Sequence, residues 1–180
     1  MKRVGFVSIL ILVLLVFTFS DSSAQIGFKG VGAHLGYVDA EGIDGTIMFG
    51  GHVNLGEIIP GLSLVPSVDY WSKSFDTGVA GVSSDFSQIS VNANVAYAFP
   101  VGESINVMAV GGIGWVRVKV EASVSGFGSV SVTDSGIGLN LGGIVSVPVS
   151  DNLSVGGGII YATKGEQIKI IGGFTFWLGQ

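Results

Sequence analysis

The chain has 180 residues, of which 30 are glycine and none is cysteine, and only 12% are charged. The lack of cysteine excludes a disulfide framework and a Cys-ligated metal site, and a formal net charge of -5 gives no basic surface for nucleic acid. The mean hydropathy of +0.66 is high for a water-soluble domain, yet beyond the N-terminus no apolar run approaches the roughly 18–20 residues of a spanning helix.

The N-terminal segment has the three parts of a secretory signal. Lys2 and Arg3 precede an apolar run over residues 4–19, and the small residues Ser22-Ser23-Ala24 precede Gln25. A membrane anchor is the alternative interpretation, but the run is short for one and polar residues follow it directly. We predict a cleaved signal peptide over residues 1–24 and one mature domain over residues 25–180.

The remaining chain alternates with a period of two, which predicts β-strands. In residues 88–99, apolar side chains such as Ile89 and Val91 occupy one face, and polar or small ones such as Ser90 occupy the other. The same pattern, in chain order, predicts strands near residues 31–37, 46–55, 62–70, 88–99, 105–115, 136–147, 153–161 and 168–178. Segments of this length can cross a bilayer as tilted strands, which need about 9–11 residues.

The connections between these strands differ at the two ends. Residues 56–61, 100–104 and 148–152 form short turns with Pro, Gly or Asn. The others cover residues 38–45, 74–85, 122–133 and 164–166, and two of them are clearly longer. Short turns at one end and longer loops at the other are typical of bacterial outer-membrane barrels.

The polar face of the strands decides what surrounds them. It is mostly Gly, Ser, Asn, Thr and Ala, which makes a poor water-exposed exterior but a good filling for a narrow barrel. Aromatic residues of the apolar face suit a membrane boundary; they are Tyr37, Tyr70, Tyr97, Phe99, Trp115, Tyr161, Phe174 and Phe176. We predict an all-β fold, an eight-stranded antiparallel up-and-down transmembrane β-barrel. A soluble lipocalin-like barrel, with the apolar face inward, is the alternative.

On these patterns the chain resembles the small eight-stranded outer-membrane barrels of the OmpX/Ail type and the transmembrane domain of OmpA-like proteins. The most specific part is the last strand, where Phe174, Phe176 and Leu178 alternate and Leu178 replaces the usual final aromatic residue. The resemblance implies localisation in the bacterial outer membrane, in contact with its lipid. It also implies that the barrel assembly machinery recognises this strand and that periplasmic chaperones deliver the chain.

Two histidines lie on the predicted inner face. A hairpin turning near Ile43 would place His34 and His52 opposite each other. A histidine pair can bind a metal, but no third ligand is evident from the spacing. We therefore interpret them as hydrogen-bonded lumen residues and assign no metal and no cofactor.

Further polar residues are candidates for the lumen. The amides are Asn92, Asn94 and Asn140, and the charged residues are Asp69, Lys73, Arg117, Lys119, Asp134 and Lys169. Charges inside a narrow barrel must pair or form hydrogen bonds, so we expect a plug of ion pairs. Glycines on the same face leave room for a pore, which is the alternative, although they also suit the tight curvature of a small barrel.

The segment Val116–Val132 departs from the pattern. Up to Trp115 the apolar residues are at odd positions, but Val116, Val118 and Val120 are at even positions. Such a change requires a bulge or a strand that has left the lipid. We expect a hairpin turning near Gly126-Phe127-Gly128, whose edge can bind an extracellular partner. An inert long loop is the alternative.

No signature of catalysis is present among the common enzyme motifs, such as G-x-S-x-G, the P-loop or H-E-x-x-H. The sequence therefore predicts a non-catalytic protein with a structural or cell-surface interaction role and a lumen mostly filled by side chains. A narrow porin-like channel for water, ions or small solutes is the second hypothesis, and a soluble lipocalin-like binding protein is the third.

Overall fold

The computed structural model describes residues 26–76, 82–102, 104–126 and 128–178; the predicted signal peptide lies outside these ranges. The strands are β1 (Gly30–Ala40), β2 (Ile43–Asn54), β3 (Glu57–Ile59), β4 (Leu62–Asp76), β5 (Val82–Phe99), β6 (Asn106–Val124), β7 (Gly128–Ser150), β8 (Leu153–Ala162) and β9 (Gln167–Trp177). Within the described ranges no helix is long and apolar enough to cross a membrane.

The strands form one closed antiparallel barrel. β1 pairs with β2, each strand from β3 to β8 pairs with the next, and β1 pairs with β9; a further pairing of β2 with β4 closes the sheet. The short β3 continues β2 along the same partner, after a turn of the backbone at Gly56, where φ is +83°. The barrel therefore has eight strands, as predicted, and each predicted strand is present.

Both described chain ends lie at one end of the barrel, here called the terminal end. The Leu178 amide donates a hydrogen bond to the Lys29 carbonyl at 2.8 Å. Three connections also lie at this end: residues 60–61, 100–105 and 151–152. We call the opposite end the far end.

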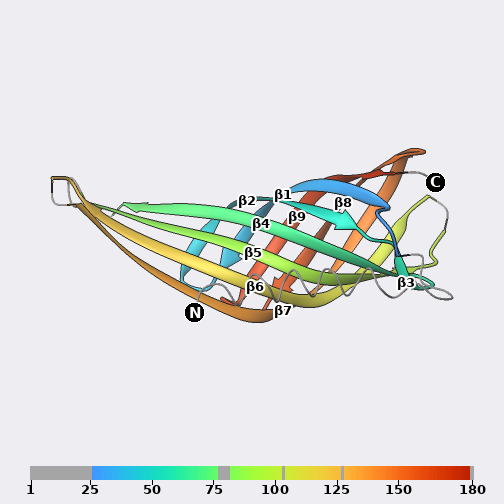
Figure 1. The fold of residues 1–180 in the computed structure, drawn as a ribbon. Helices are drawn as coiled ribbons and strands as arrows, with labels where there is room; N and C mark the ends of the chain where they lie inside the picture. Colours follow the sequence, from blue (N-terminus) through green and yellow to red (C-terminus); the bar gives the residue numbers. More distant parts are fainter. Residues whose placement is uncertain (1–25, 77–81, 103, 127, 179–180) are drawn as a thin grey trace.

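Three of the four loops predicted at the far end are wrong, because most of the described residues of 38–45, 74–85 and 122–133 belong to strands; the predicted connection at 164–166 is confirmed between β8 and β9. The β1–β2 turn contains only Glu41 and Gly42. The described residues of 74–85 and 122–133 lengthen β4 to β7, which run on beyond the remaining strands as a four-stranded sheet (Figure 1). We call this part the extension sheet; it comprises residues 72–76, 82–87, 117–124 and 128–136. The alternating Ser, Val and Thr of these segments favour strands over loops.

The parity change at Val116 is not a bulge. β5 pairs with β6 from Val82↔Val124 to Phe99↔Val107, and β6 pairs with β7 from Val124 onward, both without a register shift. The strands leave the barrel in register, and β7 begins at Gly128, close to the predicted turn; Phe127 lies outside the described residues.

The barrel is apolar outside and polar inside. Ile47 is 72% exposed and Ile137 is 74% exposed, whereas Asn92 and Lys169 are each 3% exposed. This distribution contradicts the lipocalin-like alternative, which requires the apolar face to point inward.

The extension sheet reverses this polarity. On β6 the outward face changes from Ile113 and Trp115 to Arg117 and Lys119, and valines take the inward face. The change marks the level at which the outer surface of the barrel ceases to require an apolar covering, because a charged side chain is costly in hydrocarbon but well solvated in water.

Candidate functional site

A buried carboxylate on β4 organises the middle of the lumen. Asp69 accepts hydrogen bonds from His34 Nε2 at 2.9 Å, Lys169 Nζ at 2.8 Å and Asn92 Nδ2 at 3.1 Å. These donors come from β1, β9 and β5, so the contacts cross the lumen. The Asp69–Lys169 ion pair is almost fully buried, with side-chain exposures of 7% and 4%. The structure thus brings together four of the predicted lumen residues.

Side-chain amides extend this network in both directions. Asn140 Nδ2 donates to Asn92 Oδ1 and Asn94 Oδ1, both at 3.0 Å. On the far side of the ion pair, Gln88 and Gln167 exchange two hydrogen bonds, at 3.0 and 2.7 Å. This glutamine pair is not among the predicted lumen residues. The alternation of the strands predicts it, because each glutamine directly precedes an outward isoleucine and therefore lies on the inward face.

An apolar cluster occupies the lumen near its far end. Val38, Met48 and Trp71 are at most 1% exposed and pack together, and the Trp71 ring stacks on Phe86 with 5.0 Å between ring centroids. Trp71 Nε1 is the one buried side-chain polar atom without a hydrogen-bond partner among the described residues. This cluster and the polar network together fill the far half of the lumen.

The terminal half of the lumen is hollow. A cavity of about 680 Å³ extends from His34, Asp69 and Lys169 in the middle to the exposed residues Glu57 and Asn106 at the terminal end. The predicted filling is therefore correct for the far half only. Aromatic side chains line part of the wall, including Trp177, which donates from Nε1 to Ser154 Oγ at 2.9 Å.

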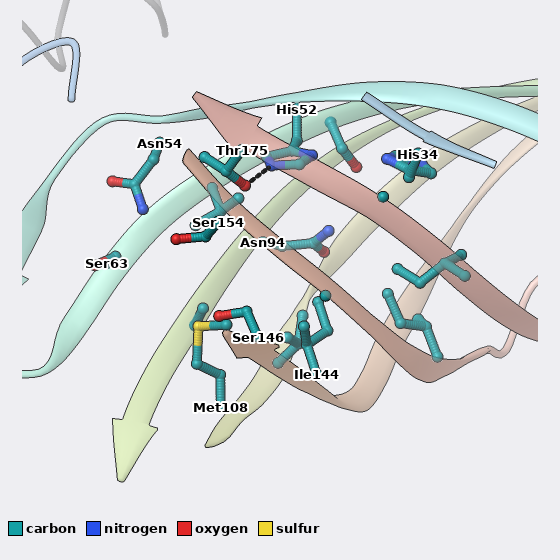
Figure 2. Close-up of a pocket in the computed structure, with 18 of the residues that line it drawn as sticks. His34, His52, Asn54, Ser63, Asn94, Met108, Ile144, Ser146, Ser154 and Thr175 are labelled. Atoms are coloured by element: carbon teal, nitrogen blue, oxygen red, sulfur yellow. Dashed lines mark hydrogen bonds between the residues drawn. The ribbon is translucent and has the colours of Figure 1, made fainter. Parts of the chain in front are cut away.

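The two histidines lie on adjacent strands but not opposite each other. His34 faces Gly50 and His52 faces Gly32, because the hairpin turns at Glu41-Gly42 rather than at Ile43. The rings stack diagonally with centroids 5.9 Å apart, and His52 Nε2 lies 2.9 Å from Thr175 Oγ1 (Figure 2). The part of the chain that the structure describes contains no group of three His, Asp or Glu side chains that could hold a metal ion.

The inward glycines form sockets for the large polar side chains. A Cβ on Gly50 would meet the His34 ring, and one on Gly32 would meet the His52 ring. On β6, a Cβ on Gly112 or Gly114 would meet the Oδ1 atom of the neighbouring asparagine of β5. These glycines accommodate the polar filling and do not widen a pore.

The remaining predicted inward charges lie elsewhere. Arg117 and Lys119 are exposed on the outward face, so their placement in the lumen is wrong. The prediction assumed that the polar face points inward along the whole strand, whereas the polarity reverses in the extension sheet. Lys73 lies at the far rim, with Nζ 3.4 Å from the Gly45 carbonyl. Asp134 is exposed on the extension sheet and pairs with Lys164 at 3.2 Å, and this ammonium lowers the pKa of the carboxyl.

The predicted boundary aromatics all lie on the outward face, each between 36% and 51% exposed; they are Tyr37, Tyr70, Tyr97, Phe99, Trp115, Tyr161, Phe174 and Phe176. Leu178 shares this face with Phe174 and Phe176, at 38% exposure. The last strand therefore presents one continuous apolar ridge.

β7 has a free edge in the extension sheet. It pairs with β8 only from Asn140 onward, and Leu139 bonds to Thr163 at the barrel rim. Since alternate residues direct their backbone groups to the same side, Ser129, Ser131, Thr133 and Ser135 direct N–H and C=O away from β6. No strand of the described ranges pairs with this edge.

Comparison with known proteins places the chain among membrane barrels. Residues 9–177 match the model of the outer membrane protein beta-barrel domain. No curated protein sequence matches the chain. Among solved structures, Neisserial surface protein A is similar over 88% of this chain and 100% of its own, with 14% identity and a TM-score of 0.62.

Two further structures have the same fold. Ail, the attachment invasion locus protein of Yersinia pestis, is similar over 84% of this chain and 98% of its own, with 14% identity and a TM-score of 0.54. The N-terminal barrel domain of Pseudomonas aeruginosa OprF is similar over 84% of this chain and 99% of its own, with 11% identity and a TM-score of 0.54.

Proposed function

We propose that this chain, which belongs to the outer membrane protein beta-barrel domain family, serves as a non-catalytic interaction protein at the cell surface. The protein is located in the bacterial outer membrane. Barrels of this kind have short turns on the periplasmic side, so the terminal end faces the periplasm and the extension sheet stands outside the cell.

The observation that carries the proposal is the free edge of β7. From Gly128 to Ser135 it has one charged residue, Asp134, and no proline, so it lacks the usual features that prevent edge pairing. An extended segment of a partner protein can add to such an edge as a further strand. The exposed Val130 and Val132, at 73% and 66%, offer apolar contacts to alternate side chains of that segment.

The opposite edge of the extension sheet is less available. On β4, Thr46 Oγ1 donates to the Ser72 carbonyl at 3.1 Å, and Lys73 reaches across to Gly45. A lysine and a short length are common protections of an edge strand. The β7 edge is therefore the preferred binding side.

A protein partner is better supported than a polyanion. Ail has been solved with the heparin analogue sucrose octasulfate. In this chain, however, two of the cations near the free edge are already paired, Lys119 with Glu121 and Lys164 with Asp134. Only Arg117, opposite Ser135, is exposed without an ion-pair partner among the described residues. A single unpaired cation is a weak site for a polyanion, whereas the edge of β7 leaves a row of backbone N–H and C=O groups unpaired within the described ranges.

The test is a proline at an edge-facing position. The protein is displayed on a non-adherent bacterium, and the cells retained on epithelial monolayers are counted. Ser131→Pro removes an N–H that points away from β6, so the sheet is expected to persist while retention falls to the level of cells without the protein. Ser131→Ala keeps the N–H and is expected to retain cells like the wild type. Equal retention of Ser131→Pro and wild type, or no retention by the wild type, would contradict the proposal.

The last strand of the barrel supports a second proposal, which concerns assembly of the protein in the membrane. We propose that the ridge of Phe174, Phe176 and Leu178 is the strand that the barrel assembly machinery recognises, after periplasmic chaperones have delivered the chain. The support is the continuous outward exposure of these three side chains on the last strand.

A further inference from the structure

The cavity in the periplasmic half of the lumen has a size and a wall that the surface role does not use. Its volume of about 680 Å³ lies within the range of small-molecule sites, roughly 300–1,000 Å³. The polar network and the Trp71 cluster close it toward the outside, and it opens beside Glu57 and Asn106 at the periplasmic end. Only a molecule from the periplasm can enter it.

One side of the wall is aliphatic. Met108, Ile144, Ile160 and Ile171, from β6, β7, β8 and β9, line the cavity. All four are inward residues of a barrel whose other inward positions are mostly polar or glycine. Against water alone this apolar surface would be unfavourable, at about 25 cal/mol for each Å². The surface is therefore suited to an apolar partner.

The other side of the wall holds hydrogen-bonding groups with spare capacity. His52 and Asn54 on β2 and Asn94 on β5 line the cavity (Figure 2). Each uses one side-chain atom in a bond: His52 Nε2 with Thr175, Asn54 Oδ1 with the Gly56 amide, and Asn94 Oδ1 with Asn140. Among the described residues, His52 Nδ1, Asn54 Nδ2 and Asn94 Nδ2 have no hydrogen-bond partner.

The charges of the cavity cancel. Asp69 and Lys169 at the closed end pair with each other at 2.8 Å, and the mouth carries Lys29 and Glu57, one of each sign. The lining therefore has no excess of either charge, and its buried pair is already satisfied, so a charged ligand has no buried counter-charge to offset its desolvation.

We propose that the periplasmic half of the lumen is a binding site for an uncharged small amphiphile. Its apolar body packs on the aliphatic wall of β6 to β9, and hydroxyl or amide groups on its opposite side bond to His52, Asn54 and Asn94. The outer membrane protein then carries two independent sites, a protein-binding edge outside the cell and a small-molecule site that opens inward.

Methionine methyl groups are suitable reporters for this site. The chain has 3 methionines, and Met48 and Met108 both line the cavity. The full-length mature protein is labelled at these methyl groups, placed in lipid nanodiscs and titrated with cis-1,2-cyclohexanediol, which has an apolar ring and two hydroxyls on one side. We expect saturable shifts of both methyl signals. myo-Inositol, which lacks the apolar face, is expected to leave them unchanged.

A matched pair of variants locates the binding. Ala98→Phe on β5 places a ring in the cavity, whereas Ala93→Phe on the same strand places it on the lipid-facing side. We expect Ala98→Phe to weaken diol binding by about tenfold or more and Ala93→Phe to leave it unchanged. Absence of saturable shifts, equal shifts with myo-inositol, or unchanged binding in Ala98→Phe would overturn the proposal.

Discussion

At the scale of single residues, the lumen depends on glycine sockets opposite large polar side chains. Gly114 lies beside Asn92, which in turn bonds to Asp69 and Asn140. A side chain at Gly114 must therefore displace a member of the central network. The glycines and the asparagines are one structural unit, although they lie on different strands.

A matched alanine pair on β6 tests this coupling. Gly114→Ala is expected to lower the free energy of unfolding by about 1–3 kcal/mol, because its Cβ would overlap Asn92. Gly111 lies on the outward face, where the atom nearest to an added Cβ would be Leu141 Cδ2 at 3.9 Å. Gly111→Ala is therefore expected to change the free energy of unfolding by less than about 1 kcal/mol. Urea unfolding in lipid vesicles measures both. Equal costs for the two variants would refute the socket interpretation.

The buried ion pair gives a second expectation. Asp69→Asn leaves Lys169 charged and unpaired at 4% side-chain exposure, which is expected to cost about 3–5 kcal/mol. Adding Lys169→Gln to the same chain removes the uncompensated charge and is expected to restore part of the loss. The same urea experiment compares the single and double variants. A double variant no more stable than Asp69→Asn alone would mean that pairing is not the cause.

At the scale of strands, the polarity reversal defines the height of the lipid on each long strand. On β7 the outward residues Ile137, Leu139 and Leu141 are more than half exposed and apolar, whereas the outward Thr133 and Ser135 are polar. The strand itself continues without interruption across this boundary. Hydrogen bonding thus holds the strand in register while the solvent outside it changes.

Lysine substitutions on the two sides of this boundary test it. Leu141→Lys is expected to lower the free energy of unfolding from the bilayer by about 2–4 kcal/mol, since a cation there lies in hydrocarbon. Thr133→Lys, on the same face of the same strand, is expected to change it by no more than about 0.5 kcal/mol. Both values come from unfolding in vesicles of one lipid composition. A costly Thr133→Lys would place the extension sheet inside the membrane.

At the scale of the whole molecule, the lumen is a pocket closed toward the outside. The glutamine pair and the Trp71 cluster occupy its far half, and the Asp69–Lys169 pair crosses its middle. This arrangement favours an interaction protein over the narrow channel that the glycine content suggested. A barrel with a blocked lumen can bind other molecules only at its extracellular end and in the cavity at its periplasmic end.

Conductance across planar bilayers tests the closure. The wild type is expected to give no conductance steps, because two layers of side chains block the lumen. A variant with alanine at Trp71, Gln88, Gln167, Asp69 and Lys169 removes both layers and is expected to conduct. The control is Tyr70→Ala, which shortens an outward side chain next to Trp71 and is expected to stay closed. Heat-modifiable gel migration verifies that each variant is folded. Steps in the wild type would contradict the blocked lumen.

The sequence alone determined the strands, their number and the face that each buries. These features follow from the alternation of neighbouring residues, which is local. It also contained the lumen pairings in part, since Asp69, Asn92, His34 and Lys169 share the inward face. Arg117 was misplaced by the assumption that the polar face points inward along the whole strand, although Arg117 continues the outward face of Ile113 and Trp115.

Tertiary structure decided the register, and through it the site. Whether His34 faces His52 or Gly50 depends on where a hairpin turns, and a turn moved by about one residue shifts every partner by two positions. The free edge of β7 arises because β8, the next strand, is shorter and pairs with β7 only from Asn140 onward. The cavity depends on which side chains from eight strands meet across the axis. Such contacts are properties of the closed barrel, so no single stretch of sequence encodes them.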